Sequence, residues 1–471
     1  MALLRIRRRK AQGLQPLGFG QSLRKGNSMQ RRDFLKRSGM AAGVSLTGAV
    51  ASGLYAQGKP APSERISVAV AGVGGRGGSL LAAFASLPEV EVRYVCDVDE
   101  RVLKQATASV ADRTGRQPKP IKDFRVALDD KSLNALVLGT PDHWHAIPTI
   151  NACQAGKDVY VEKPDGHNAI EGRTMVAAAK KYGRVVQLGT QCRSGPYFHS
   201  AMDYVRKGSL GRVKFAKAWE SSKQGSIGHP PDGTPPPGVD YDLWLGPAPK
   251  RPFNVRRFHG SWRWFFDYGT GDLGNDGVHR LDIARWGLET GVAAGGEKLP
   301  LLPQKVSALG GKYYFDDDQE WPDTLMVVYD YPGYVLYYEM RIWSPYPLEG
   351  ESEGAAVFGD KGYIVIGNSR WRAFDGRGKQ VDQQQGSYND VGHIRNFLEC
   401  MRTRRKPAAD LETIGHPSSL LCHLGNASWR AGRTLRFDPA TYTFQDDADA
   451  NRYLSRPQYR KPWVLPSLAE L

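Results

Sequence analysis

The chain has 471 residues, and its hydrophobic fraction of 41% and charged fraction of 24% are ordinary for a globular protein with room for two domains. Its net charge of +15 is concentrated near the N-terminus, because residues 1–56 hold eleven Lys or Arg and one acid, which leaves +5 for residues 57–471. That remaining charge gives no reason to expect a nucleic-acid partner, and the five scattered cysteines predict neither a disulfide framework nor a zinc site.

Residues 1–56 are predicted to be a twin-arginine export signal with an upstream extension. The sequence Gln-Arg-Arg-Asp-Phe-Leu-Lys at residues 30–36 is followed by an uncharged, mildly apolar run from Gly39 to Tyr55. This run is too weakly apolar to predict a membrane span. We therefore expect a periplasmic protein without a membrane span; the alternative for this segment is a disordered basic tail.

Residues 64–190 are predicted to form a dinucleotide-binding domain. A strand at 65–73 leads into a Gly-x-Gly-x-x-Gly pattern, whose glycines permit a tight turn and let backbone N–H groups approach a pyrophosphate. A second strand, 90–96, ends in Asp97, where a carboxylate would hold the ribose diol of NAD and repel the 2′-phosphate of NADP. The predicted cofactor-binding residues here are Gly72, Gly74, Gly75, Arg76, Gly77 and Asp97.

Two later strands of this domain also end in polar residues. In an open α/β sheet, ligands bind beyond the carboxyl ends of the strands. Strand 135–139 is followed by Thr140, Pro141, His143 and His145, and strand 159–161 is followed by Glu162 and Lys163. With a last strand at 185–189, the segment predicts a Rossmann fold, a doubly wound parallel sheet.

Residues 191–437 are predicted to be an α+β domain with a large, mostly antiparallel open sheet. Candidate strands are 212–220, 305–315, 325–331, 334–342, 355–359 and 363–367. Turn signals at Pro332-Gly333 and at residues 360–362 join the last four strands into two hairpins. Helices are expected at 391–403 and 416–430, and a proline-bearing arm at 438–471.

These motifs follow one another in an order that resembles the glucose–fructose oxidoreductase/inositol dehydrogenase (Gfo/Idh/MocA) family. The resemblance is carried by residues 72–77, Asp97, 140–145, 155–157 and 162–164, and it extends more loosely to about residue 435. It implies that NAD is the cofactor, that Lys163 lies at the nicotinamide and the substrate, and that His143 and His145 lie near the nicotinamide end. Polar packing within the loop is the alternative for both histidines. The resemblance also implies a homo-oligomer, a dimer or a tetramer.

The segment 269–282 is expected to carry catalysis. Asn275 or Asp276 is predicted to cap a helix that places His279 in its first turn. The resemblance implies that His279 is a general base with an Asp four residues earlier, but that position is Asn275 here. We expect Asp272 or Asp276 to replace this Asp, or His279 to act without one; the alternative is a histidine packed beneath the sheet.

An aromatic run at 261–268 predicts the substrate subsite. Aromatic rings stack on the apolar faces of sugars, although core packing is the alternative for about half of these rings. The residues expected to contact substrate are Trp262, Trp264, Tyr268, Asp272 and Arg193. Three further histidines, His393, His416 and His423, lack metal-ligand spacing, and no metal is predicted.

The predicted function is NAD-dependent oxidation or reduction of a sugar or sugar-derivative carbinol. His279 would take the hydroxyl proton, Lys163 would stabilise the alkoxide, and Glu162 would orient Lys163. An exported enzyme has little free NAD, so the cofactor is expected to stay bound and to be recycled. One alternative is a glycosidase or lyase that works by transient oxidation and elimination, as in the NAD-dependent α-N-acetylgalactosaminidases of this superfamily. Another is a non-catalytic sugar-binding protein that retains NAD.

Overall fold

The structure of the chain is a computed structural model that describes residues 64–471. The export signal predicted at 1–56 lies outside the described residues.

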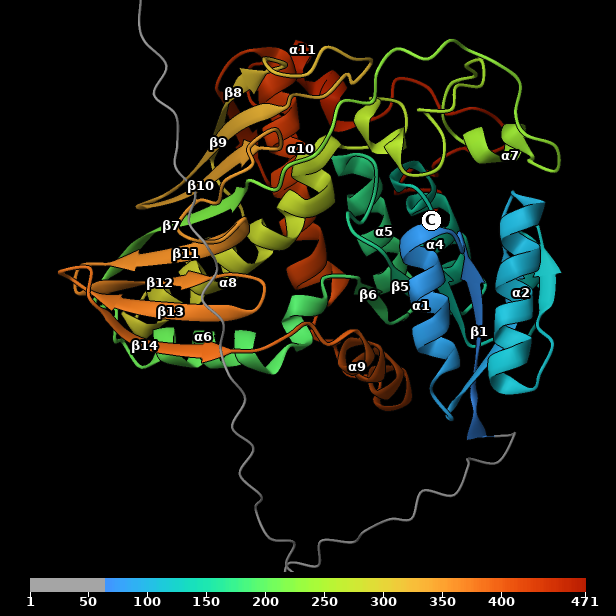
Figure 1. Cartoon of the computed structure of the whole chain (residues 1–471), viewed down its shortest axis with the longest axis horizontal. Coiled ribbons are helices and arrows are strands. Elements are labelled where there is room, and N and C mark those ends of the chain that lie inside the picture. Colours follow the sequence, from blue (N-terminus) through green and yellow to red (C-terminus); the bar gives the residue numbers. More distant parts are fainter. Residues whose placement is uncertain (1–63) are drawn as a thin grey trace, which may run out of the picture. The chain divides into compact units, whose positions relative to one another are not determined.

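The first sheet has six parallel strands in the order β3-β2-β1-β4-β5-β6, which confirms the doubly wound sheet (Figure 1). Its strands are β1 (Ile66–Ala71), β2 (Val90–Cys96), β3 (Lys119–Ile121), β4 (Ala135–Leu138), β5 (Asp158–Val161) and β6 (Val186–Leu188). The accompanying helices are α1 (Gly75–Ala85), α2 (Glu100–Thr114), α3 (Arg125–Leu128), α4 (Ala146–Gln154) and α5 (Ala169–Lys181).

Both faces of this sheet are covered, which explains why its inner strands are continuously apolar. In β1, Val68 and Val70 pack into a core with α1 and α2, whereas Ala69 and Ala71 pack into the opposite core with α4 and α5. The alternation follows from the two-residue period of a strand.

The second sheet has ten strands in the order β14-β13-β12-β11-β7-β10-β9-β8-β15-β16. They are β7 (Val213–Glu220), β8 (Lys305–Gly311), β9 (Thr324–Tyr331), β10 (Tyr334–Arg341), β11 (Glu353–Gly359), β12 (Gly362–Ile366), β13 (Arg370–Asp375), β14 (Gln380–Gln385), β15 (Leu435–Asp438) and β16 (Thr443–Phe444). All its pairs are antiparallel except β7 with β10, and the predicted hairpins β9–β10 and β11–β12 are present. Four strands, β13 to β16, were not predicted.

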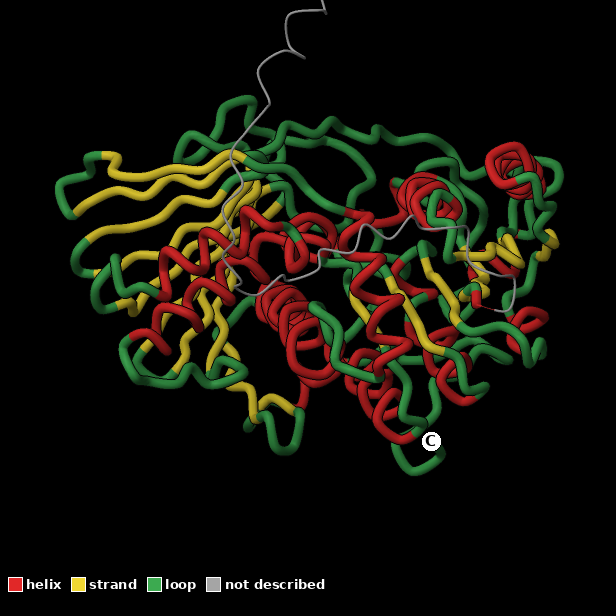
Figure 2. The backbone as a smooth tube through the Cα atoms, turned by 90° about the horizontal axis from the view of Figure 1, so that it is seen from below, coloured by secondary structure: helices red, strands yellow, loops and turns green. Residues whose placement is uncertain are grey.

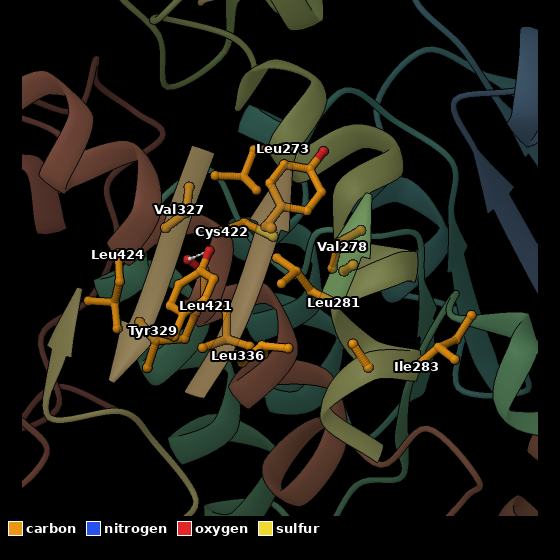
Figure 3. Close-up of a cluster of buried hydrophobic side chains, with 14 of the residues drawn as sticks. Leu273, Val278, Leu281, Ile283, Val327, Tyr329, Leu336, Leu421, Cys422 and Leu424 are labelled. Atoms are coloured by element: carbon orange, nitrogen blue, oxygen red, sulfur yellow. Dashed lines mark hydrogen bonds between the residues drawn. The ribbon is translucent and has the colours of Figure 1, made fainter. Parts of the chain in front are cut away.

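Helices cover one side of the second sheet (Figure 2). The helices of this half are α6 (Pro196–Arg206), α7 (Tyr241–Leu245), α8 (Val278–Ala294), α9 (Asp390–Thr403), α10 (His416–Ala431) and α11 (Ala448–Asn451). Leu281 of α8 and Leu424 of α10 pack with Val327, Tyr329 and other buried side chains of the strands (Figure 3). This packing fixes α8, and therefore the segment before it, against the sheet.

The start of α8 differs from the prediction. A π-helical turn, Leu273–Gly277, precedes α8, and no side chain caps the helix. The expectation that Asn275 or Asp276 is the N-cap was therefore wrong. The π-helical turn continues directly into α8, and the Asn275 amide is instead bonded to the side chains of Asp272 and Asp276.

Two late segments return to the first sheet. Ile394 and Phe397 of α9 belong to the core beside α1, and Trp463 and Leu471 of the predicted C-terminal arm belong to the core beside α4. The division near residue 190 therefore separates the two sheets but not their cores. Within residues 64–471, no helix is long and apolar enough to cross a membrane.

Candidate active site

A cavity of about 610 Å³ lies at the carboxyl edge of the first sheet. The predicted residues among its lining are Gly72, Gly74, Gly75, Arg76, Asp97, Thr140, Pro141, Glu162 and Lys163. Trp262, Arg263 and Asn275 line it from the second half of the chain. The cavity thus brings together the glycine loop, Lys163 and one of the predicted aromatic rings.

The glycine loop has the geometry that a pyrophosphate requires. Gly72 has a φ of +72°, and a Cβ at Gly77 would lie 1.6 Å from the Gly72 carbonyl oxygen, so neither position tolerates a side chain. A Cβ at Gly74 would meet nothing within 4 Å, because that position faces open space. The open side of the loop, at the start of α1, fits the phosphates of a dinucleotide.

Asp97 is positioned by backbone donors. One carboxylate oxygen accepts from the Val73 N–H at 2.9 Å and the other accepts from the Asp99 N–H at 3.0 Å. Burial raises the pKa of Asp97, and these two hydrogen bonds oppose that shift. The carboxylate is fixed where a ribose diol would reach it.

Glu162 contacts a different cation from the one predicted. Its Oε1 accepts from Arg76 Nε at 2.9 Å, and Arg76 also pairs with Asp390 of α9 at 2.8 Å. Within residues 64–471, Glu162 and Lys163 form neither a hydrogen bond nor an ion pair with each other. The expected orientation of Lys163 by Glu162 is therefore absent, because Glu162 pairs with the guanidinium of Arg76 through Oε1.

Lys163 is positioned by Asn275. Its Nζ donates to the Asn275 backbone oxygen at 2.8 Å and to Asn275 Oδ1 at 3.2 Å. The Nδ2 of the same amide donates to Asp272 Oδ1 at 3.2 Å and to Asp276 Oδ2 at 3.0 Å. A single neutral side chain therefore connects the lysine with two carboxylates.

His279 lies in the first turn of α8, as predicted, but it is buried and does not line the cavity. Burial, and then the positive charge of Lys163, hold the pKa of His279 well below its usual value. Its Nδ1 has no hydrogen-bond partner among the described residues, so neither Asp272 nor Asp276 forms the expected relay with this nitrogen.

The two predicted loop histidines are buried against backbone oxygens. His143 faces the Trp244 oxygen at 2.9 Å and the Tyr268 oxygen at 3.3 Å, and burial lowers its pKa to about 3. His145 faces the oxygens of Pro164 and Thr140 at 2.6 and 2.8 Å. Neither ring lines the cavity, so the structure gives both histidines the packing role that was the alternative.

The predicted substrate residues divide by burial. Trp262 is half-buried and lines the cavity, whereas Trp264 and Tyr268 belong to the hydrophobic core. Arg193 is buried in an ion pair with Asp282 at 2.8 Å and does not reach the cavity. Asp272 is buried behind Asn275. Trp262 is therefore the one member of this set that lines the cavity.

Several residues near the site were missed from the sequence. Asp390 pairs with Arg76, His259 lines the cavity and pairs with Asp99 at 2.9 Å, and Glu220 approaches Asp272 and Asp276. They come from segments far apart in the chain without any local motif. Only the position of Glu220 at the end of a predicted strand offered a signal.

The fold and the cavity define an α/β protein built to bind a dinucleotide, and comparison with known families identifies its class. Residues 66–190 match the oxidoreductase family, NAD-binding Rossmann fold, and residues 214–292 and 354–465 match the C-terminal alpha/beta domain of the same oxidoreductase family. Together these matches cover more than half of the chain. The chain belongs to the Gfo/Idh/MocA oxidoreductase family, and NAD is its cofactor.

Individual similar proteins are more distant. A "Glycosyl hydrolase family 109 protein" of Shewanella pealeana is 26% identical over 209 residues, which is 40% of this chain and 45% of that relative. The aldose-aldose oxidoreductase of Caulobacter crescentus has 20% identity and a TM-score of 0.60 over 79% of this chain and all of its own. The WlbA dehydrogenase of Bordetella pertussis, solved with NADH and UDP-GlcNAcA, has 19% identity and a TM-score of 0.59 over 79% of this chain and 99% of its own. At these identities the structural matches show a shared fold.

Proposed function

We propose that the protein is an NAD-dependent oxidoreductase acting on a carbinol of a sugar or sugar derivative. The observation that carries this proposal is the shared cavity: the glycine loop and Asp97 meet Lys163, Asn275 and the half-buried ring of Trp262 there. The similar structures include an aldose-aldose oxidoreductase and a dehydrogenase solved with NADH and a nucleotide sugar, which supports the same substrate class.

The glycine loop, Arg76 and Asp97 would hold NAD, which when bound supplies a hydride acceptor for the carbinol carbon. Lys163 places a positive charge where the carbinol oxygen loses its proton, and that charge favours the alkoxide. His279 does not line the cavity, and its strongly lowered pKa makes the ring a weak base, so we do not assign the proton acceptor to it. Trp262 offers a flat apolar face to the sugar ring.

The test is replacement of the lysine. Lys163→Ala is expected to lower turnover by about 10²–10³-fold, because one preorganised charge is lost from the alkoxide. NAD affinity is expected to change little. Single-turnover absorbance of the reduced nicotinamide, over a panel of sugars, measures the first quantity, and calorimetric NAD titration measures the second. Exposed Lys131→Ala is the matched control, and near-normal turnover of the Lys163 variant would refute the assignment.

A second candidate function is redox-neutral glycoside cleavage, favoured by the similarity to glycosyl hydrolase family 109 proteins. Transient oxidation of a carbinol acidifies the neighbouring C–H, so the aglycone leaves by elimination before water adds and the carbonyl is reduced again. Release of aglycone from glycosides without net NADH would support this candidate. Accumulation of NADH with an oxidised sugar would support the simple dehydrogenase.

Export and assembly complete the proposal. We place the protein in the periplasm on the twin-arginine pattern, with NAD retained through the cycle; cell fractionation and nucleotide release by denaturation test both points.

The uncovered face of the second sheet exposes Leu309, Met326 and Val328, which favours pairing with another copy. Light scattering after size exclusion should give a dimer or a tetramer, and Met326→Asp should weaken it.

A further inference from the structure

Three carboxylates converge beside Lys163 and Asn275. Glu220 ends β7, Asp272 directly precedes the π-helical turn before α8, and Asp276 lies within that turn. One oxygen from each lies within 4.8 Å of the corresponding oxygens of the other two. Among residues 64–471, none of the three forms an ion pair, although lysines and arginines are abundant in the chain.

Two of these side chains are buried with one oxygen free. Glu220 and Asp272 are each 1% exposed. Glu220 Oε1 accepts from the Ser222 N–H at 2.8 Å, and Asp272 Oδ1 accepts from Gln224 Nε2 at 3.0 Å. Glu220 Oε2 and Asp272 Oδ2 have no hydrogen-bond partner among residues 64–471. Each carboxylate is thus oriented by a donor at one oxygen and is available for a ligand at the other.

A separate buried group faces the same place. The Tyr338 hydroxyl of β10 is fully buried and has no hydrogen-bond partner in the described part of the chain, although the charges of Asp272 and Glu220 act on it. A Cβ at Gly277 would lie 2.6 Å from this hydroxyl oxygen, so the hydroxyl lies against the π-helical turn. An unpaired hydroxyl beside unpaired carboxylate oxygens indicates a ligand between them, since buried polar groups are otherwise paired.

We propose that Glu220, Asp272 and Asp276 bind a hard divalent cation, Mg²⁺, Ca²⁺ or Mn²⁺. Carboxylate oxygens are the ligands that these ions prefer, at about 2.0–2.6 Å. Oxygens around one such ion lie at most about 5 Å apart, so three oxygens within 4.8 Å of one another are close to the spacing that a single ion requires. An ion at this place would also offset the mutual repulsion of the carboxylates, two of which are buried. Asn275, which contacts two of the ligands and Lys163, would connect the cation to the cavity. The proposal goes beyond the redox function and needs neither NAD nor sugar.

The test is calorimetric titration of chelator-treated protein with each chloride salt, in the absence of nucleotide and sugar. We expect one site for at least one of the three ions and a concentration-dependent rise in the melting temperature. Asp272→Asn and Glu220→Gln should each weaken binding at least about tenfold, because each removes a charged ligand. Asp382→Asn, on the exposed strand β14, is the control and should bind as the parent protein does.

The proposal is overturned if none of the three ions binds at millimolar concentration, or if both variants bind as tightly as the parent. Circular dichroism and the melting curve identify a variant that has lost its fold, in which case the other variant decides. Because binding is measured without turnover, loss of the cation site leaves the redox assignment untouched. Failure of the Lys163 test likewise leaves the cation result standing.

Discussion

Asn275 joins the basic and acidic parts of the site through one amide. Its oxygen accepts from Lys163, and its nitrogen donates to Asp272 and Asp276. A carboxylate at this position could accept from the lysine, but it would bring a further negative charge beside the two aspartates and could donate to neither. The neutral amide is therefore the side chain that satisfies all three neighbours, which explains why the Asp expected from the family pattern is absent.

Asp97 leads to a prediction about cofactor choice. Asp97→Ala should weaken NAD binding by about 10–100-fold, since a charged hydrogen bond to a ribose contributes about 1.5–3 kcal/mol. It should weaken NADP binding less, because repulsion of the 2′-phosphate disappears. Paired titrations with the two nucleotides measure the change in preference, and an unchanged NAD:NADP ratio would contradict the role.

The buried histidines predict a pH dependence of stability. The pKa of His143 is about 3 in the folded protein, below the value of about 6.5 in an unfolded chain, so the unfolded chain takes up a proton first as the pH falls. The free energy of unfolding therefore falls progressively as the pH drops below about 6.5. His143 alone lowers it by about 2 kcal/mol at pH 5.

The measurement is urea unfolding at pH 7 and pH 5. His143→Phe should be less stable at pH 7, because it loses its contacts to the Trp244 and Tyr268 oxygens, but it should lose less stability on acidification than the parent. His229→Gln is the control, because that exposed histidine pairs with Asp318, which raises its pKa. Removing His229 should therefore not reduce the free energy of unfolding that is lost on acidification. If the His143 variant and the parent lost the same free energy of unfolding between pH 7 and pH 5, His143 would be charged in the folded protein.

At the scale of elements, two glycines of the same loop are required for different reasons, one for the fold and one for nucleotide binding. A side chain at Gly77 would collide with backbone, whereas one at Gly74 would enter the cavity. Gly77→Ala should therefore destabilise the protein without any nucleotide, by about 2 kcal/mol or more. Gly74→Ala should unfold like the parent but bind NAD more weakly.

Thermal unfolding without nucleotide, followed by NAD titration, distinguishes these two effects. If Gly77→Ala were as stable as Gly74→Ala, the close approach of α1 to the Gly72 carbonyl would not be a constraint.

Elements with a strong local pattern were predictable, and those without one were not. In α2, Asp99 caps the first turn and Gly115 ends the helix in a left-handed conformation, and both are signals that the local sequence carries. β14 has the sequence Gln-Val-Asp-Gln-Gln-Gln and is exposed throughout, so it shows no apolar alternation. Pairing with β13 alone makes this segment a strand, and that is a tertiary contact.

At the scale of the molecule, the described chain cannot be divided cleanly into a nucleotide half and a substrate half. Trp463, near the C-terminus, packs against Trp144 at 4.8 Å between ring centroids, and the Arg125 guanidinium lies 4.3 Å from its ring. The last residues therefore complete a core that begins with the first strands.

Trp463→Ala should consequently lower the free energy of unfolding by about 3 kcal/mol, the cost of a large buried side chain. Leu468→Ala is the control, because Leu468 is 46% exposed and should change stability by less than about 0.5 kcal/mol. Chemical unfolding followed by tryptophan fluorescence and by circular dichroism measures both variants. If Trp463→Ala lowered the free energy of unfolding as little as the control does, the C-terminal segment would not be part of this core.

The sequence by itself determined the parallel sheet, the glycine loop and the order of Asp97, Lys163 and His279 along the chain. These features depend on local signals: apolar runs, turn residues and fixed spacing within one βα unit. Only the tertiary structure decided what each side chain contacts. Arg76 pairs with Glu162, His143 faces backbone oxygens, and Glu220 lies near Asp272 although 51 residues separate them in the sequence. Such contacts arise where separate strands and helices converge, and no spacing along the chain encodes that convergence.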